Sequence, residues 1–344
     1  MVTTLTVREL DSDAAERWDR FVEGCPNATF FHKAGWKPVI EASFGHRAIF
    51  LYAQRAGEIA GVLPLVHMHS RVFGRALVSS AFCVEGGPAA ADAEAAAALT
   101  ARACELADEL DVDYVEFRGV ARAAPAWACK DDLYAVFRRP LDPDPDRALA
   151  AIPRKQRAVV RQSLQAGLTA TVEDDPADFF RAYSHNLRSL GTPAFPRRYF
   201  RALKERFGDA CEILAVRRDG RVVAGLTTFH FRGTVLPYYG GGTDEARDTG
   251  AYNFMYWDVM RRACLSGHRV FDFGRSKRGT GAFAYKKNWG FEPQPLYHEY
   301  LVRRGAVPEK HALNPKFRPL IALWKRLPLA VANGLGPLIV RNFG

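Results

Sequence analysis

Several polar side chains stand where short apolar strands are predicted to end. Asp272 lies between Phe271 and Phe273. A carboxylate among apolar neighbours either accepts a structural hydrogen bond or acts as a base or as the group that orients one. Arg275 and Ser276 follow this strand, at the edge where clefts of α/β proteins open. Arg275 could bind a phosphate or a carboxylate, and the structural alternative is a turn residue that caps nearby carbonyls.

A run of glycines supplies a second candidate site. Tyr239 precedes Gly240, Gly241 and Gly242 at the end of a predicted strand, and a helix is predicted over 253–265. Glycines let the backbone approach a ligand closely, and the N-terminus of a helix attracts phosphate. The pattern predicts a donor-binding site with Tyr239 as a candidate catalytic side chain. The alternative is an ordinary glycine turn.

Basic side chains gather on one predicted helix within residues 151–167. Pro153 suits the first turn of this helix and Gly167 suits its C-terminal cap. Its basic residues could contact the phosphates of tRNA, or they could simply line a solvated helix. These residues are Arg154, Lys155, Arg157 and Arg161.

No cluster suited to a metal ion or to a covalent intermediate stands out. His67 and His69 would point the same way along a strand, but two histidines without a third ligand make a poor site, so no metal is expected. The 6 cysteines are scattered without a Cys-x-x-Cys pair, which indicates reduced thiols in a reducing compartment. No Ser-His-Asp or Cys-His arrangement is visible, which favours a mechanism without a covalent enzyme intermediate.

The elements that must position these residues occur twice. Residues 51–65 (LYAQRAGEIAGVLPL) and 214–229 (LAVRRDGRVVAGLTTF) each form a strand, a turn built on glycine and a second strand, at an offset of about 163 residues. Each copy is predicted to be an α/β (α+β) unit, a mixed and largely antiparallel sheet flanked by helices. We expect 133–138 to close the first copy and 295–302 to close the second. Only the second copy holds the glycine run, so we expect the working cleft there.

The chain is predicted to have four segments, and the last of them is a C-terminal tail. This tail is basic, and Pro319, Pro328 and Pro337 break its apolar stretches. With Trp324 it would either lie in an anionic membrane interface or pack on the domains. The predicted segments are a first domain over 1–140, an acidic linker and basic helix over 141–167, a second domain over 168–303 and a tail over 304–344.

Composition limits the classes of partner. The chain has 344 residues, 48% of them hydrophobic and 25% charged, as in globular domains. The formal net charge of +10 indicates an anionic partner, unless it reflects a genome that prefers arginine. The N-terminus shows no secretion signal and no apolar run reaches the ~20 residues of a membrane span, so we expect a cytoplasmic protein, free or peripheral at the inner face of the membrane.

The order of these elements and several short strings resemble a known family. The order resembles the GNAT acyltransferase fold, and two copies in one chain resemble the FemAB group, which transfers aminoacyl groups from tRNA to peptidoglycan precursors. The resemblance covers essentially the whole chain, and the strings are most similar to FemAB-related, BioF2-like proteins associated with the PEP-CTERM/exosortase system. They are LGTP (190–193), FDFGRS (271–276), YKKNWGF (285–291), FHKAGW (31–36) and GVLPLV (61–66).

The resemblance implies roles for residues that the pattern alone leaves open. Tyr285 and Lys286 match the family's Phe-Lys-x-x-Phe/Trp-Gly string, whose lysine is thought to stabilise developing negative charge. Arg247 and Gly250 match part of the acetyl-CoA motif of GNAT enzymes, but Tyr252 stands where that motif has a small residue. The donor is therefore either an acyl-CoA or an aminoacyl-tRNA.

The family context implies the reaction. We expect an acyl- or aminoacyltransferase that acts on an amine of a cell-envelope or exopolysaccharide precursor by direct attack, with Lys286, Asp272 and Tyr239 as catalytic candidates. No tightly bound cofactor is expected, only the donor as co-substrate. The alternative is a non-catalytic module that binds an anionic glycan or lipid at the membrane.

Overall fold

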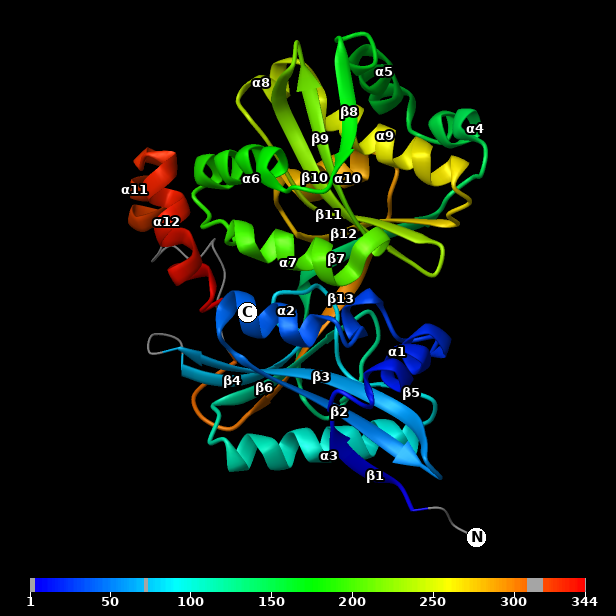
Figure 1. Ribbon diagram of the computed structural model, residues 1–344, viewed down its shortest axis with the longest axis vertical. Coiled ribbons are helices and arrows are strands. Elements are labelled where there is room, and N and C mark those ends of the chain that lie inside the picture. The colour runs from blue at the N-terminus through cyan, green and yellow to red at the C-terminus, as the bar shows by residue number, and fades with distance from the viewer. Residues whose placement is uncertain (1–3, 71–73, 308–317, 344) are drawn as a thin grey trace. The chain divides into compact units, whose positions relative to one another are not determined.

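The computed structural model describes residues 4–70, 74–307 and 318–343 and divides the chain into two compact units (Figure 1). Unit 1 comprises Met1–Tyr134, Pro295–Glu309 and Arg341–Gly344, and unit 2 comprises Ala135–Gln294 and Lys310–Val340.

Unit 1 is a sheet in the order β1-β2-β3-β4-β6-β13, with β5 beside β3. Its neighbouring strands run antiparallel, except that β4 and β6 are parallel. Its elements are β1 Thr6–Glu9, α1 Ala15–Gly24, the 3-10 turn Phe30–His32, α2 Trp36–Phe44, β2 Arg47–Arg55, β3 Glu58–Ser70, β4 Gly74–Ser79, β5 Ala89–Ala90, α3 Ala93–Glu109, β6 Tyr114–Gly119, the start of β7 Ala128–Pro140, and β13 Pro293–Val302.

Unit 2 repeats this plan with the strand order β7-β12-β11-β10-β9-β8. Here β11 and β12 are the parallel pair. Its elements are the end of β7, α4 Pro145–Ala150, α5 Arg154–Ser163, β8 Leu168–Glu173, α6 Ala177–Leu190, α7 Arg197–Phe207, the 3-10 turn Gly208–Ala210, β9 Cys211–Arg218, β10 Arg221–Phe231, β11 Thr234–Gly242, α8 Glu245–Asp248, α9 Ala251–Leu265, β12 Val270–Lys277, α10 Gly281–Asn288, α11 Arg318–Arg326 and α12 Leu329–Val340.

The fold class predicted from the sequence is confirmed: the structure is a mixed α/β fold with largely antiparallel strands flanked by helices. Both predicted hairpins are present. Asp219 and Gly220 connect β9 and β10 with φ values of 50° and 75°. Such positive φ angles at both turn residues match the right-handed twist of the flanking strands.

The closing strands are exchanged between the copies, and this corrects the sequence prediction. We expected residues 295–302 to close the second copy, yet β13 pairs with β6 of unit 1, Val302 opposite Tyr114. In turn, β7 continues into unit 2 from Ala135 onward. Strands pair through backbone hydrogen bonds, which depend little on the identity of the side chains. Both closing segments are similar apolar strands, so their side chains do not identify the partner of either one. The sequence therefore shows that a closing strand exists but not which sheet it joins.

A pair of glycines lets helix α6 lie close against the sheet of unit 2. Gly225 on β10 stands opposite Gly241 on β11. A Cβ on Gly225 would lie 2.9 Å from Cα of Phe179, and one on Gly241 would lie 2.7 Å from Cα of Tyr183. Phe179 and Tyr183 are one helical turn apart on α6, so the helix backbone rests directly on the two glycines.

The flanking glycines of the run face the other side of the sheet. A Cβ on Gly240 would meet Tyr256 of α9, and one on Gly242 would meet Ala246 of α8 and Tyr252 of α9. Because successive side chains of a strand point to opposite faces, α6 covers one face of β11 and α9 covers the other.

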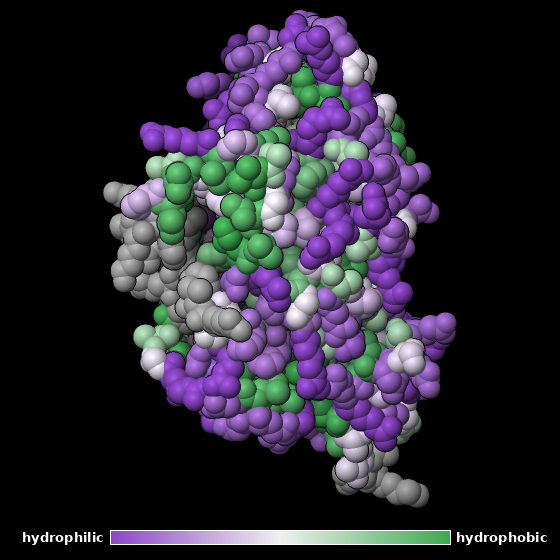
Figure 2. Space-filling model, turned by 60° about the vertical axis from the view of Figure 1, so that its left-hand side comes forward, coloured by the Kyte–Doolittle hydropathy of each residue, from purple (hydrophilic) through white to green (hydrophobic). Residues whose placement is uncertain are grey.

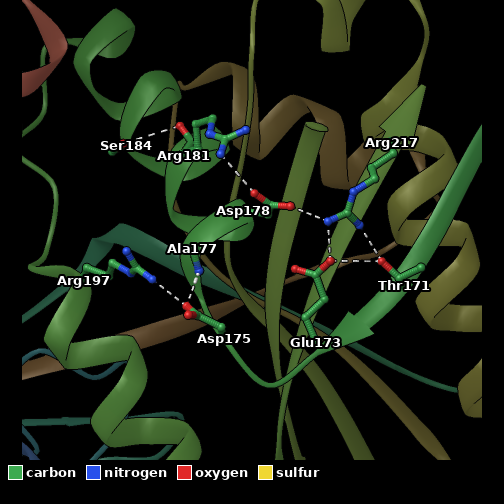
Figure 3. Close-up of polar contacts among 9 residues, drawn as sticks. All are labelled: Thr171, Glu173, Asp175, Ala177, Asp178, Arg181, Ser184, Arg197 and Arg217. Carbon is green, nitrogen blue, oxygen red and sulfur yellow. Dashed lines mark hydrogen bonds and ion pairs between the residues drawn. The ribbon is translucent and has the colours of Figure 1, made fainter. Parts of the chain in front are cut away.

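An ionic network holds the N-terminal end of α6 to the sheet (Figure 3). Arg217 of β9 binds Glu173 of β8 and Asp178 of α6, and it donates to Thr171 Oγ1 at 2.6 Å. One guanidinium thus connects β8 and β9 with the first turn of α6.

Substituting Gly241 by alanine should destabilise unit 2 by about 2 kcal/mol, because the added methyl group would force α6 off the sheet. Urea unfolding would measure this loss. Gly24→Ala is the matched control, because a Cβ there meets nothing within 4 Å and the residue ends α1. Equal stability of both variants would show that α6 does not rest on Gly241.

Candidate functional site in unit 2

The parallel strands of unit 2 separate soon after they begin. β11 and β12 pair only at Thr234–Val270 and Val235–Phe271. Beyond these pairs β11 stays with β10, and its register shifts between Thr227 and Thr228 by a bulge. The edge of β12 that faces β11 is therefore not used by β11 beyond Phe271. On its other edge β12 keeps β7 as its neighbour.

Asp272 lies at this point of β12 and is 3% exposed. Its Oδ1 accepts a hydrogen bond from the backbone N of Gly274 at 2.7 Å, and its Oδ2 binds Nε of Arg138 on β7. Gly274 has a φ of 66°, which glycine adopts without strain. The carboxylate therefore fixes the turn of the backbone after Phe273 and pairs with a cation.

Arg138 is the site residue that sequence reasoning missed. It lies in the segment that was expected to close the first copy, but it pairs with Asp272 of the second. The available signal was a base at the end of an apolar strand, LYAVFR. Without knowledge of the strand exchange, that signal has no partner.

Lys286 projects from α10 toward the same stretch of β12. Its Nζ donates to the carbonyl oxygens of Gly274 at 3.1 Å and Arg275 at 3.0 Å. It also lies 5.5 Å from the ring centroid of Phe137 and 5.9 Å from that of Phe273. The helix that carries it is capped by Thr280, whose Oγ1 accepts from the N of Phe283. Lys286 is thus held in place by two carbonyls between two aromatic rings.

This environment lowers the pKa of Lys286 to about 7. Removal from water is the main cause, since a charged ammonium loses its hydration; Arg275 lowers the pKa further, and Asp272 opposes both. Near neutral pH the amine is therefore divided between its charged and neutral forms. In the neutral form both N–H groups serve the two carbonyls and one lone pair remains.

Tyr285 ties three helices of unit 2 together. Its hydroxyl donates to Oδ1 of Asn253 in the first turn of α9, at 3.0 Å. Oδ1 of Asn253 also accepts a hydrogen bond from Nε2 of Gln156 on α5, at 2.8 Å. Burial raises the pKa of Tyr285 well above its ordinary value, so the phenol keeps its proton. These contacts orient α10 and hence Lys286.

Tyr239 lies in an aromatic cluster and is 8% exposed. Its hydroxyl shares a hydrogen bond of 2.9 Å with that of Tyr199 on α7, and the rings of Tyr183 and Phe200 pack edge-on against it. These are the surroundings of a packing residue. Its catalytic role stays a prediction.

The remaining donor-site candidates surround the start of α9. Gly250 caps this helix with a φ of 70°, and a Cβ there would lie 3.1 Å from Cβ of Ser163 on α5. Arg247 on α8 is exposed, whereas Ser276 on β12 is buried. Helix α5 thus lies beside the first turn of α9, where a donor phosphate would be expected. With Gly240, Gly241 and Gly242 packed by helices, the donor roles of these residues stay predictions.

The basic residues of α5 lie on its outer side. Its buried residues are Gln156, Val160 and Ser163. Arg154, Lys155 and Arg161 are exposed, and Arg157 donates to the carbonyl of Ala150 at 2.6 Å. The structure therefore brings Asp272, Arg275 and Lys286 together, whereas the α5 bases Arg154, Lys155 and Arg161 are exposed to solvent.

Within residues 4–70, 74–307 and 318–343, no three His, Cys, Asp or Glu side chains are placed to hold a metal ion. No helix in those same ranges is both long and apolar enough to cross a membrane.

Comparison with known proteins supports the fold. Residues 150–287 match the family model described as the acetyltransferase (GNAT) domain. This range holds α5, α9, β12 and Lys286, and therefore most of the candidate site. No curated protein sequence matches the chain at a significant level.

Solved structures resemble the chain over most of its length. FemX is similar with a TM-score of 0.68 at 16% identity, over 86% of this chain and 97% of that one. L-PGS from Bacillus licheniformis is similar with a TM-score of 0.57 at 14% identity, over 93% and 99%. A tandem GNAT protein from the clavulanic acid biosynthesis pathway gives 0.53 at 16% identity, over 88% and 100%. At these identities the likeness concerns the fold, which is GNAT-like.

Proposed function

We propose that this protein is an N-acyltransferase whose reaction takes place on unit 2, where β12 separates from β11, with Lys286 as the group that carries the proton. The observation that supports this most is the environment of Lys286: a pKa of about 7, with Nζ held by Gly274 and Arg275. An ordinary surface lysine has a pKa near 10.4 and would be almost fully charged at neutral pH.

The proposed reaction is direct transfer. The acceptor amine attacks the acyl carbonyl, a C–N bond forms, and the tetrahedral oxyanion then expels the donor's thiol or hydroxyl group. The amine must lose a proton in this sequence, and the lone pair of neutral Lys286 takes it. The resulting ammonium has a third N–H, which stabilises the oxyanion and then gives its proton to the departing thiolate or alkoxide, so that Lys286 becomes neutral again. Asp272 favours that charged form, because its carboxylate raises the pKa of Lys286.

The donor is an acyl-CoA or an aminoacyl-tRNA. The GNAT domain match and the Arg247–Gly250 remnant support an acyl-CoA. The exposed bases of α5 support a tRNA. For the acceptor we propose an amine of a cell-envelope or exopolysaccharide precursor at the cytoplasmic side, which rests on the resemblance to FemAB-related proteins.

Ligand-induced stabilisation tests the donor. We expect either acyl-CoAs or aminoacyl-tRNA to raise the melting temperature, since a ligand at 100 times its Kd stabilises by about 2.7 kcal/mol. Free CoA and uncharged tRNA serve as controls for the acyl group. The stabilising donor is then mixed with glucosamine-type and peptidyl amines, and the amide product is measured by mass spectrometry. If no donor stabilises the protein and no amide forms, the proposal is wrong.

A second candidate is a binding module for an anionic glycan or lipid. Two contacts favour it, because they occupy the place expected for a donor. Helices α6, α8 and α9 fill both faces of the glycine run, and α5 lies beside the start of α9. In that case Lys286→Ala would leave glycan or lipid binding unchanged, and no donor would bind.

A further inference from the structure

Helix α12 buries small residues and exposes large apolar ones, which is the opposite of what a surface helix in water does. Its buried residues are small, Ala332 and Gly336. A Cβ on Gly336 would lie 3.0 Å from the carbonyl oxygen of Ala194, so the helix backbone lies directly against its support. Its large apolar side chains point outward: Leu335 is 45% exposed and Leu338 is 63% exposed. A surface helix normally buries its large apolar residues and exposes polar ones.

Helix α11 adds to the same surface. Leu320 is 62% exposed and Leu323 is 61% exposed, whereas Trp324 is buried. The helix is attached through Ile321, which lies against Gly191 after the end of α6. Figure 2 shows apolar residues gathered on the side of the molecule where α11 and α12 lie. The leucines therefore face outward, whereas Trp324 packs inward.

The charged side chains of this segment have one sign. Leu329–Val340 has no ionisable side chain, and residues 318–343 contain no Asp or Glu. Lys325 and Arg326 are both exposed and end α11, so that in the sequence they lie between the apolar stretches of the two helices. Exposed leucines bordered by bases match the interface of a bilayer that contains anionic lipids.

Two other occupants fit these features less well. Helix α12 has 12 residues and is therefore about 18 Å long, too short to cross an apolar layer of about 30 Å. A second copy of the chain would place the same basic surface against itself around a two-fold axis, and like charges would repel. A membrane surface instead offers the apolar layer and the opposite charge together.

We propose that α11 and α12 form a docking surface that lies in the plane of an anionic membrane, with Leu320, Leu323, Leu335 and Leu338 inserted among the acyl chains. Lys325 and Arg326 contact the lipid headgroups. This inference does not depend on the proposed transferase reaction, because binding to lipid is measured without donor or acceptor.

Co-sedimentation of the full-length protein with vesicles tests the proposal. Wild type should bind vesicles of phosphatidylglycerol mixed with phosphatidylcholine, and bind phosphatidylcholine alone more weakly. The double variant Leu335→Glu/Leu338→Glu should bind at least about tenfold less. It loses apolar area that would be buried in the bilayer, and its glutamates repel the anionic lipid. Lys325→Glu/Arg326→Glu should remove the preference for phosphatidylglycerol.

Leu265→Glu is the matched control, because Leu265 ends α9 and is 64% exposed. It should bind vesicles as wild type does. The substituted leucines are exposed, so all variants should keep the melting temperature of wild type. Failure of wild type to bind phosphatidylglycerol vesicles would overturn the proposal, as would equal binding by the double variant. Dimers that the double variant abolishes, without vesicle binding, would assign the surface to a second copy instead.

Discussion

Replacing Lys286 by methionine should reduce the rate of transfer by about 10²–10³-fold, the usual contribution of a positioned proton carrier or oxyanion donor. In wild type the rate should rise with pH through an apparent pKa of about 7, because the neutral amine is the reactive form. The variant should lose this limb of the pH profile. Lys287→Met is the control, since Lys287 is the exposed neighbour on the same helix. A variant with the wild-type rate would remove Lys286 from the mechanism.

The same substitution should change how stability depends on pH. The pKa of Lys286 is lower in the folded protein than the 10.5 of a free side chain, so between these values the unfolded chain binds one more proton. Wild type therefore gains stability relative to Lys286→Met as the pH rises from 7 to 10. We expect a gain of about 2–3 kcal/mol, since each unit is worth about 1.4 kcal/mol and part of the side chain is exposed. Urea unfolding at both pH values measures it, and no gain would mean an ordinary lysine.

Breaking the pair of Arg138 and Asp272 should have the largest effect on stability. Asp272 is 3% exposed, and without it the guanidinium of Arg138 loses its carboxylate partner. Asp272→Asn keeps an oxygen for the N of Gly274 but removes the charge, and we expect a loss of about 3 kcal/mol in the free energy of unfolding. Arg138→Met should cost a similar amount, and the double variant should cost less than the sum of the two.

Two controls sharpen this experiment. Glu94→Gln removes a partner of Arg55 that is 71% exposed on its side chain, and it should cost less than 1 kcal/mol. Asp272→Asn should also lower the pKa of Lys286 further, because Asp272 raises it in wild type. The limb of the pH–rate profile would then move to lower pH. If the losses in unfolding free energy of Asp272→Asn and Arg138→Met simply add in the double variant, the two residues do not interact.

Local features of the fold could be predicted from the sequence because neighbouring residues determine them. The turn at Asp219–Gly220 and the helix over 253–265 follow from turn chemistry and apolar period, and the structure contains both, with the helix at Ala251–Leu265. The glycine run is visible in the sequence, whereas the residues that pack against it are not. Whether Gly241 meets a ligand or Tyr183 depends on where α6 lies, and α6 is about 60 residues away in the chain.

The candidate site was predictable only in part for the same reason. Asp272 and Lys286 stood out by type and by resemblance, whereas Arg138 comes from a strand whose partner no local pattern identifies. The low pKa of Lys286 also needs the fold, because it arises from burial of the side chain and from the placement of Arg275. The tail was expected as proline-broken stretches, yet helix α12 continues through Pro337.

The exchanged closing strands also constrain how this chain can evolve. Each repeat encodes a strand that completes the sheet built by the other, since β13 joins β6 and β7 continues beside β12. Deleting either half of the gene would leave the surviving half with an unpaired sheet edge, which invites aggregation. A half whose own chemistry is no longer needed is therefore retained as a folding partner. The duplication would therefore persist even if only one of its copies carried out chemistry.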